Sequence, residues 1–448
     1  MKNWSVGYEI IRTYMKFALW LTHKRIVVSG QHLIPEGKPI IFAPNHQNAL
    51  MDPLAVSCTN KYQTLWLARA DIFKSKTASP ILKYLKLLPV YRIRDGKDNL
   101  SNNEQIFQQV TQLLENKQTV ALFPEAAHSG RRQMLPHKKA IPRIALEAEA
   151  KNHFTLNLQI VPVGIYYDHY WAFNRSLIIE YGEPISIEKY NDEYEENPQK
   201  AMLSLRDDIY SRIVPLTLQI NSKKNYHEYE ELKQVAGKTC SKSHFFSKNK
   251  YLQMFYADKE LIKKLELLEG SDPEKFGVLI EKSKGYFRTL KEANASDDQI
   301  ERISNVGWPG FLTSFFAIIL TLPVFAFGFI FNSVPFYVPR KILRRKVKNI
   351  TFLSTFNFVT GLIIFPIAYL MEAALLLALT NSWVTAVSAF ILMPFAGKCA
   401  WQLLGFYQNN LDDLLFLAGN KTDRNKLNQL VKQRTELVDL IILNGWKF

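Results

Sequence analysis

Cysteine is scarce in this chain of 448 residues, because only Cys58, Cys240 and Cys399 occur and they lie far apart. Their positions match no metal-ligand spacing and no disulfide framework, which is typical of a protein from a reducing compartment. The chain also lacks internal repeats and low-complexity tracts. A chain of this length without repeats is expected to fold as two or three domains.

Charged residues are absent from three long stretches in the last third of the chain, namely 303–339, 349–371 and 373–397. Uncharged, mostly apolar stretches of this length indicate membrane helices, because a helix needs roughly 20 residues to cross the hydrocarbon core. The sequence therefore predicts an integral membrane protein with a soluble front and a membrane region at residues 303–406.

The first of these stretches leaves two topologies open. Six cations follow it between residues 340 and 348, and such a cluster favours the cytoplasmic side. Pro323 divides the stretch near its middle, so we prefer a broken re-entrant hairpin, which keeps the soluble front and the basic loop on one face. The alternative is a single crossing, giving three spans. Spans near 352–379 and 382–405 would return the helix at 407–448 to the cytoplasm.

The N-terminal segment, residues 1–25, does not resemble a secretory signal, because charges interrupt its apolar residues and no small-residue cleavage site follows. Apolar residues recur at helical spacing from Trp4 to Leu19. This pattern predicts an amphipathic helix that either lies in the membrane interface or packs on the following domain.

Residues 26–190 alternate strand-like runs with helical patterns, which predicts an α/β domain. Strands are expected at 25–29, 39–43, 62–67, 119–123, 159–166 and 177–181, and helices at 100–116 and 139–151. Several of these strands end in polar residues, which would meet at one edge of the sheet, where sites of open α/β sheets commonly form. Residues 191–302, rich in charge with leucines at helical spacing, are predicted to be a helical insertion or adaptor of unassigned role.

The stretch from Ile40 to Pro53 carries the main candidate site. His46 follows a strand-like run, and Asp52 precedes a proline suited to the first position of a helix. If His46 lies in a loop and the chain folds back at the helix start, Asp52 can orient the imidazole as a general base. The alternative interpretation is that Asp52 only caps that helix.

Three further short patterns follow in order. Arg92 and Arg94 stand two residues apart, so on a strand they share a face and either bind one phosphate or remain as solvated surface arginines. Glu125 ends the run Phe-Pro-Glu after a strand. Pro162 lies inside a buried strand, where proline is better placed at a sheet edge or a bulge.

In this order, the four patterns resemble those of the glycerolipid acyltransferase superfamily, the glycerol-3-phosphate and lysophosphatidate acyltransferases. The resemblance covers residues 26–190 and implies their mixed sheet flanked by helices. It implies that His46 deprotonates an acceptor hydroxyl, that Asp52 orients it, and that Arg92, assisted by Arg94, binds phosphate. By the same resemblance Glu125 serves acceptor binding or site architecture. Pro162 shapes the acyl-donor side.

Two departures from that family pattern matter. Five residues separate His46 from Asp52, where four are common, and the longer spacing resembles the branch of fungal-type glycerol-3-phosphate acyltransferases with membrane segments after the soluble domain. After Glu125 the usual glycine is Ala126, and the arginine that often follows is replaced by Ala127-His128. Downstream cations either supply the missing charge or form a solvated basic face: Arg131, Arg132, Lys138 and Lys139.

A net charge of +15 indicates anionic partners, and no nucleic-acid motif accompanies it. The resemblance implies an acyl-CoA or acyl-carrier-protein donor, a glycerol 3-phosphate or lysophospholipid acceptor, and anionic membrane lipids as partners. It requires no metal and no cofactor, since a thioester is already activated. The leading hypothesis is an O-acyltransferase acting on the 1-hydroxyl of glycerol 3-phosphate with its active domain on the cytoplasmic face. The alternatives are a lysophosphatidate or other lysolipid acyltransferase, and a non-catalytic lipid-binding membrane module.

Overall fold

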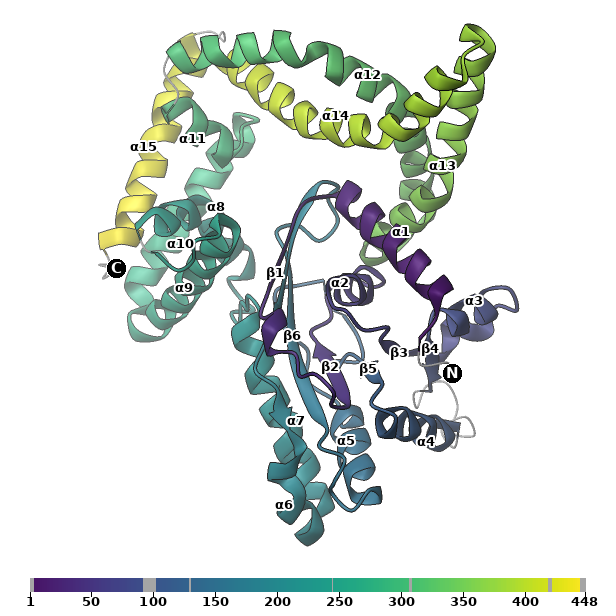
Figure 1. The fold of residues 1–448 in the computed structure, drawn as a ribbon. Helices are drawn as coiled ribbons and strands as arrows, with labels where there is room; N and C mark the ends of the chain where they lie inside the picture. The colour runs from purple at the N-terminus through teal and green to yellow at the C-terminus, as the bar shows by residue number, and fades with distance from the viewer. Residues whose placement is uncertain are drawn as a thin grey trace. The chain divides into compact units, whose positions relative to one another are not determined.

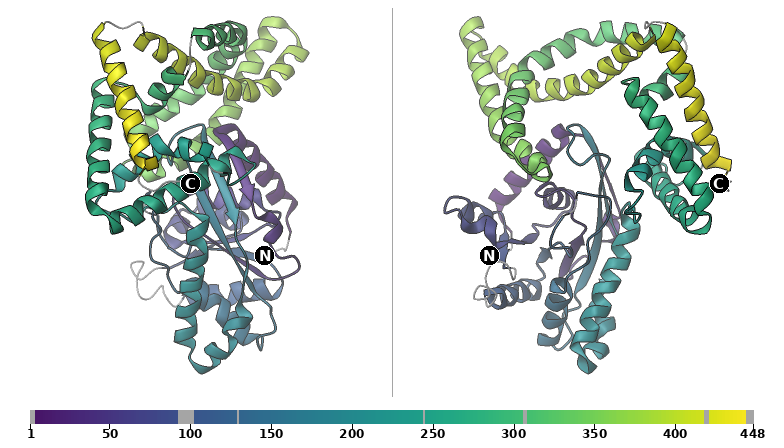
Figure 2. Two further views of the ribbon diagram at one scale, coloured as in Figure 1. Left: turned by 90° about the vertical axis from the view of Figure 1, so that its left-hand side faces the viewer. Right: turned by 180° about the vertical axis from the view of Figure 1, so that it is seen from behind.

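The computed structural model describes residues 4–91, 102–128, 130–243, 245–305, 308–417 and 421–443. The chain divides into two compact units, Met1–Thr217 with Ile342–Thr360, and Leu218–Lys341 with Gly361–Phe448. The first unit is built on a β-sheet, and the described part of the second is helical, as Figures 1 and 2 show.

An eight-stranded sheet organises the first unit, with the strands in the order β1-β7-β6-β2-β5-β3-β4 and the short β8 beside β6. The strands are β1 His23–Ser29, β2 Ile40–Pro44, β3 Leu65–Arg69, β4 Leu87–Val90, β5 Thr119–Ala121, β6 Gln159–Tyr167, β7 Arg175–Tyr181 and β8 Ile185–Ser186. β2 pairs in parallel with β5 and β6, whereas β6 runs antiparallel to β7 and β8. The sheet is therefore mixed, as expected. All the predicted strands are present, and β4 and β8 were missed.

Helices cover both faces of this sheet, which is why every residue of β2 is buried. Ile41 and Ala43 belong to a core cluster that contains side chains of α4, α5 and α7. Phe42, with the opposite orientation in the strand, contacts the rings of Tyr62 and Tyr181. The helices of this unit are α1 Val6–Thr22, α2 Met51–Thr59, α3 Ala78–Tyr84, α4 Asn102–Glu115, α5 Ala140–Lys151, α6 Asn191–Glu196 and α7 Pro198–Ile213.

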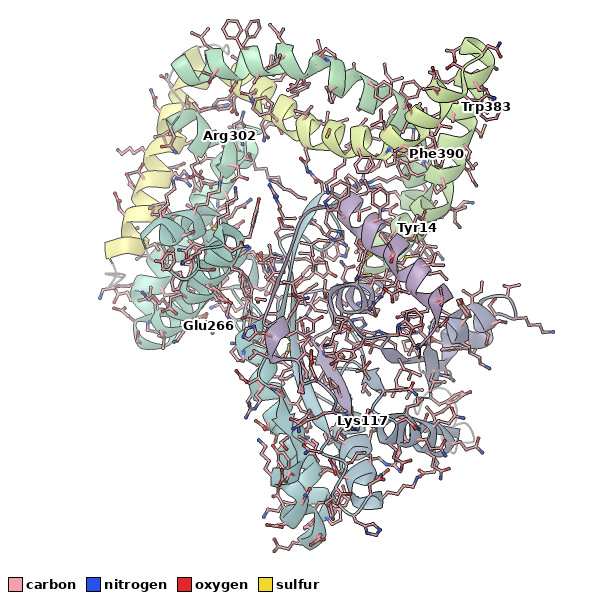
Figure 3. All side chains as sticks on the ribbon, in the orientation of Figure 1. Tyr14, Lys117, Glu266, Arg302, Trp383 and Phe390 are labelled. Atoms are coloured by element: carbon pink, nitrogen blue, oxygen red, sulfur yellow. The ribbon has the colours of Figure 1, made fainter. Side chains whose placement is uncertain are left out.

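The N-terminal helix α1 packs on the sheet domain and also presents apolar side chains outward. Leu19 is buried, and Arg12 inserts its guanidinium toward the backbone carbonyls of Asn60 and Tyr62. On the other side of the helix Ile10 is 66 % exposed, and Tyr14, labelled in Figure 3, is also exposed. Packing on the domain, one of the two expected roles, is therefore present. The outer side remains available for the other role.

The first unit extends beyond the predicted domain boundary at residue 190. Helix α7 packs against α5 and β6, and its residues Leu205 and Ile209 belong to the same core cluster as the sheet. The boundary predicted from composition is too early, because the charged exterior of α7 hides its buried apolar stripe.

The second unit consists of helices in its described residues: α8 Tyr226–Ser243, α9 Lys250–Ser271, α10 Pro273–Glu292, α11 Asp297–Asn305, α12 Trp308–Lys346, α13 Leu353–Thr380, α14 Trp383–Leu417 and α15 Lys421–Leu443. Both α12 and α13 continue into the residues of the first unit. Three helices are long and apolar enough to cross a membrane, over Leu312–Lys346, Ile350–Thr380 and Trp383–Leu417.

Helix α12 differs from the preferred prediction, because it runs unbroken through Pro323 instead of reversing there. The prolines within it, Pro323, Pro335 and Pro339, each remove one backbone donor without ending the helix. A hairpin would place several residues outside helical geometry, where their backbone N–H and C=O groups lose their hydrogen bonds within the helix. A single long helix keeps those groups bonded.

Small residues and one polar cluster join α12 to α14, which lie side by side in Figures 1 and 2. A Cβ added at Gly328 would lie 2.2 Å from the carbonyl oxygen of Ala396, so only glycine permits this approach. Asn332 donates to the Met393 carbonyl at 3.3 Å and accepts from the Tyr369 hydroxyl at 2.6 Å. At the far end of α14, Arg302 of α11 (labelled in Figure 3) pairs with Asp413 at 2.9 Å.

Candidate active site

His46 and Asp52 meet directly. His46 lies in the loop after β2, Asp52 is the second residue of α2, and Nδ1 of the imidazole is 2.8 Å from Oδ2 of the carboxylate. The chain folds back between them, as the sequence required for contact. With Nδ1 bonded to the carboxylate, Nε2 is the ring nitrogen left to take a proton from a substrate.

Asp52 is held as an orienting group, and the capping interpretation is wrong. Its Oδ2 also accepts the backbone N–H groups of Gln47 and Asn48, each at 2.7 Å, so it binds the preceding loop and not the first turn of α2. The helix begins at Met51, ahead of Pro53, and its N-cap makes no side-chain hydrogen bond. The carboxylate is fully buried.

A tyrosine lies beneath this pair. Tyr167, the last residue of β6, is fully buried, and burial together with the neighbouring Asp52 carboxylate raises the pKa of its hydroxyl. The phenol is therefore uncharged, and because the Asp52 carboxylate beside it is 0 % exposed, solvent does not screen that charge. A carboxylate shielded in this way interacts more strongly with His46 than one in solvent would.

Two asparagines fix the loop that carries His46. Asn45 forms a two-way bond with the backbone of Ile165, accepting its N–H at 2.6 Å and donating to its carbonyl at 3.1 Å. Asn48 donates to the Tyr170 carbonyl at 2.8 Å. Because both contacts cross to β6 and the loop after it, the imidazole is positioned by the sheet itself.

Glu125 ties the same loop to a second segment. Its Oε1 accepts the backbone N–H of His46 at 2.8 Å and its Oε2 that of Leu135 at 2.7 Å. Burial raises the pKa of this carboxyl to about 8, with a further contribution from Asp52 and an opposing one from the two backbone donors. Since both oxygens already bind backbone groups, the structure favours the architectural role over direct acceptor binding.

Aromatic rings surround the imidazole of His46. Phe123 stacks on it with ring centroids 3.8 Å apart and planes 14° from parallel. His128 meets it edge-on, at 5.1 Å and 84°. Ala126 adopts a left-handed backbone, φ 57°, which turns the chain between Glu125 and His128. Glycine adopts this conformation without strain, which accounts for its use at this turn in the family pattern.

The remaining predicted residues are not all brought to this edge. Lys138 and Lys139 are exposed, and Lys139 contacts Gln199 of α7 at 3.3 Å. Arg132 is buried and donates to the carbonyls of Tyr167 and Asp168, so it supports the end of β6. Arg92 and Arg94 lie outside the described residues, just beyond β4.

Pro162 was expected at an edge or a bulge, and the structure corrects this. It lies in β6, a central strand with β2 on one side. On its other side the partner changes from β8, paired through Ile160, to β7, paired from Val163. Proline is tolerated at this change of partner because its missing N–H falls where the ladder is interrupted, while its carbonyl accepts from Gly182 at 2.9 Å.

Sequence reasoning missed Arg69 at the same edge of the sheet. It ends β3, opposite Val90 of β4, and binds Asp71 with one N–H at 3.1 Å. Its charge contributes to lowering the pKa of His128, which places it in the electrostatic environment of the site. The predicted strand stopped at residue 67, and two more residues would have included this arginine.

Sequence reasoning also missed the turn between α12 and α13, which contacts the site within the first unit. Thr355 Oγ1 accepts the Leu50 N–H at 3.2 Å, and Ser354 Oγ donates to the Tyr170 carbonyl at 3.1 Å. Phe352 meets the ring of His128 at 5.4 Å. No local pattern marks this turn, because its partners lie about 180 to 305 residues away in the chain.

Comparisons with known proteins indicate what the chain is similar to. Residues 25–166 match the family model described as Acyltransferase. The chain is 25 % identical over 316 residues to Glycerol-3-phosphate O-acyltransferase 2 of Saccharomyces cerevisiae, covering 65 % of this chain and 41 % of that protein. It is also 25 % identical over 259 residues to Glycerol-3-phosphate O-acyltransferase 1 of the same yeast, covering 56 % and 33 %. The chain thus spans about two fifths and one third of the length of these relatives.

Solved structures were also matched. One of them is the 1-acyl-sn-glycerophosphate acyltransferase PlsC from Thermotoga maritima, with a TM-score of 0.34 and 20 % identity, covering 46 % of this chain and 78 % of that one.

Proposed function

We propose that this chain, whose residues 25–166 match the family model described as Acyltransferase, transfers a fatty acyl group from an acyl thioester to the 1-hydroxyl of glycerol 3-phosphate. The observation that carries the proposal is the His46–Asp52 pair, 2.8 Å apart, with one imidazole nitrogen left open at the end of a central strand. This is the arrangement a general base needs.

The chemistry follows from these groups. Nε2 of His46 takes the proton of the acceptor hydroxyl while its oxygen attacks the carbonyl carbon of the thioester. Asp52 stabilises the resulting imidazolium through Nδ1. When the tetrahedral intermediate collapses, the carbon–sulfur bond breaks and the leaving thiolate receives the proton from His46. No enzyme-bound acyl group is needed.

The acceptor is the finer part of the proposal. Two yeast relatives are named as glycerol-3-phosphate O-acyltransferases, and five residues separate His46 from Asp52, as in the family branch that acts on that acceptor. Lysophosphatidate is the second candidate acceptor, because the same base and the same donor serve it. A coenzyme A or carrier-protein thioester satisfies the donor chemistry equally.

The product of the proposed reaction is a lipid, and the apolar helices of this chain would hold the protein at the membrane that receives it. Three helices are long and apolar enough to cross it, and the segment from Arg340 to Lys348 is strongly basic. Residues 342–360, which follow Lys341, belong to the same unit as the acyltransferase domain, and basic segments favour the cytoplasmic side, where they attract anionic lipid headgroups, so we place that domain on the cytoplasmic face.

An acceptor-competition assay tests the proposal. Membranes containing the full chain receive labelled acyl-CoA or acyl carrier protein with glycerol 3-phosphate or lysophosphatidate, beside membranes containing His46→Ala. We expect faster acylation of glycerol 3-phosphate and a loss of about 10²–10⁴-fold in His46→Ala, the range for a general base. Preference for lysophosphatidate would change the acceptor and keep the mechanism. Equal rates in the variant and the parent would end the proposed role of His46.

A further inference from the structure

His128 is the titratable side chain nearest to the reacting edge that the mechanism above does not use. Its ring centroid lies 5.1 Å from that of His46, and the two rings are almost perpendicular. For reaction, the acceptor oxygen and the thioester carbon must lie about 3–3.5 Å apart. The acceptor oxygen must also lie next to Nε2 of His46, which takes its proton. A ring at this distance from His46 is close enough to border the reacting atoms.

The nitrogens of His128 differ in their surroundings. Nδ1 is buried and has no hydrogen-bond partner among the described residues. A buried N–H without a partner is rarer in proteins than a buried acceptor without one, so the neutral ring carries its proton on Nε2. Nε2–H is then the group that can donate to a ligand.

The ring is held in its neutral form. Burial lowers the pKa of His128, and His46 and Arg69 lower it further while Asp52 opposes them. A neutral donor at this place does not repel the imidazolium that forms on His46. A permanent cation there would oppose the proton transfer that the mechanism requires.

The turn between α12 and α13 holds the ring in place. Phe352 packs against the ring of His128 in an edge-to-face arrangement, with centroids 5.4 Å apart and planes 76° from parallel. Ser354 and Thr355, at the start of α13, are hydrogen-bonded to Tyr170 and Leu50 and so fix the turn that precedes them. The orientation of His128 therefore depends on a segment that the acyltransferase sequence motifs do not include.

We propose that His128 donates a hydrogen bond from Nε2 to the carbonyl oxygen of the acyl thioester as negative charge develops there, and that Phe352 positions the ring. The inference rests on the proposed acyl transfer. As the acceptor oxygen bonds to the carbonyl carbon, the carbonyl π pair moves onto oxygen, where Nε2–H stabilises it. The proton stays on His128. The pair returns to re-form the carbonyl when the thiolate leaves.

Because the oxyanion belongs to the donor, the effect of His128 does not depend on the acceptor. Full-length His128→Ala should lose about 10²–10³-fold in kcat, the range for one oxyanion donor, with little change in acceptor KM. The loss should be equal with glycerol 3-phosphate and lysophosphatidate. His128→Gln, whose amide N–H reaches a similar position, should recover a measurable part of it. The exposed His32 provides the matched control, His32→Ala, which should not change either constant.

The outcomes separate the possibilities. A rise in KM for phosphate-bearing acceptors at unchanged kcat would assign His128 to phosphate binding and overturn the inference, as would unchanged kinetics. Failure of the unsubstituted protein with every donor and acceptor would instead refute the proposed function on which it rests. Thermal unfolding of each variant shows whether a loss of activity comes from misfolding. Phe352→Ala should reproduce part of the kcat loss and add nothing to His128→Ala, whereas additive losses would exclude the positioning role.

Discussion

Two buried carboxylates, one in each unit, show how the partner decides what an acidic side chain can do. Asp52 in the sheet unit is 0 % exposed, and Asp297 in the helical unit is 1 % exposed. Asp52 binds His46 and two backbone N–H groups. Asp297 binds the guanidinium of Arg434 at 2.8 Å and the hydroxyl of Tyr286 at 2.8 Å.

The difference lies in what each partner can still do. Arginine has no acceptor and does not release its proton in proteins, so the Arg434–Asp297 pair cannot transfer protons. It joins α15 to α11, and its residues lie within the helical unit. Histidine keeps an open nitrogen after binding Asp52, and that nitrogen can do chemistry. One pair therefore serves structure and the other serves reactivity.

Further acids surround Asp297, yet cations already neutralise them. Asp297, Asp298 and Glu301 bring three carboxylate oxygens within 4.8 Å of one another. Lys238 binds Glu301 at 2.7 Å, and Arg434 approaches the same residue at 3.4 Å. This cluster acts as an ion-pair network between helices.

The largest expected effect tests the reactive pair. Asp52→Asn should lower kcat by about 10²–10⁴-fold, because the amide no longer stabilises the imidazolium and turns the ring to the wrong tautomer. Steady-state acylation with saturating donor measures it. Asp192→Asn on α6, an exposed site, is the control. A loss below threefold in Asp52→Asn would mean that His46 needs no orienting carboxylate.

The structural pair should give the opposite pattern. Asp297→Asn removes the nearer of the two carboxylates beside Arg434 and leaves Glu301 at 3.4 Å, so the helical unit is expected to lose about 1–3 kcal/mol of stability. Chemical denaturation of the full chain in detergent measures the loss. For the protein that remains folded, kcat should match the parent. A specific loss in kcat with unchanged stability would contradict the division between the two carboxylates.

A third buried carboxyl, that of Glu125, should make the stability of the protein depend on pH. Its raised pKa, about 8, means that the folded protein keeps a proton that the unfolded chain releases above its ordinary pKa near 4.5. Stability from this group is fully present below pH 4.5 and should fall as pH rises to 8. Glu125→Gln should flatten that slope in a series of thermal midpoints.

The control for that series is a second buried glutamate. Glu149 is 1 % exposed and accepts the N–H groups of Leu156 and Leu158, like Glu125 but away from the site. Glu149→Gln should lower the midpoints at each pH, which measures the cost of losing two such backbone bonds. An unchanged slope in Glu125→Gln would show that another group titrates.

The smallest expected effect concerns the turn before His128. Ala126→Gly should stabilise the protein by up to about 1 kcal/mol, because the left-handed backbone costs alanine about 1–2 kcal/mol and glycine's greater freedom when unfolded offsets part of that. The neighbouring Ala127→Gly has no such strain to relieve and should destabilise by about 0.5–1 kcal/mol. Destabilisation by both would show that the turn is not strained.

Much of the sheet unit was predictable because its signals are local. Apolar runs located the predicted strands, and the fold-back from His46 to Asp52 follows from six residues and a helix start. The short β4 was not among the predicted strands because Leu87–Val90 carries no alternation, and Arg69 was missed because the strand predicted for β3 stopped at residue 67. The preferred hairpin at Pro323 was wrong for the helix itself, since a proline signals a break only where nothing else supports the backbone.

Local patterns in the sequence located most strands, the apolar helices and the candidate pair of His46 and Asp52, because periodicity and short spacing act between residues close together in the chain. The mixed sheet was expected from the family resemblance, not from these patterns. Tertiary packing was needed to show that Glu125 binds backbone on both oxygens and that the ring of His128 contacts the rings of His46 and Phe352. Those contacts join segments up to some two hundred residues apart, and packing alone selects them.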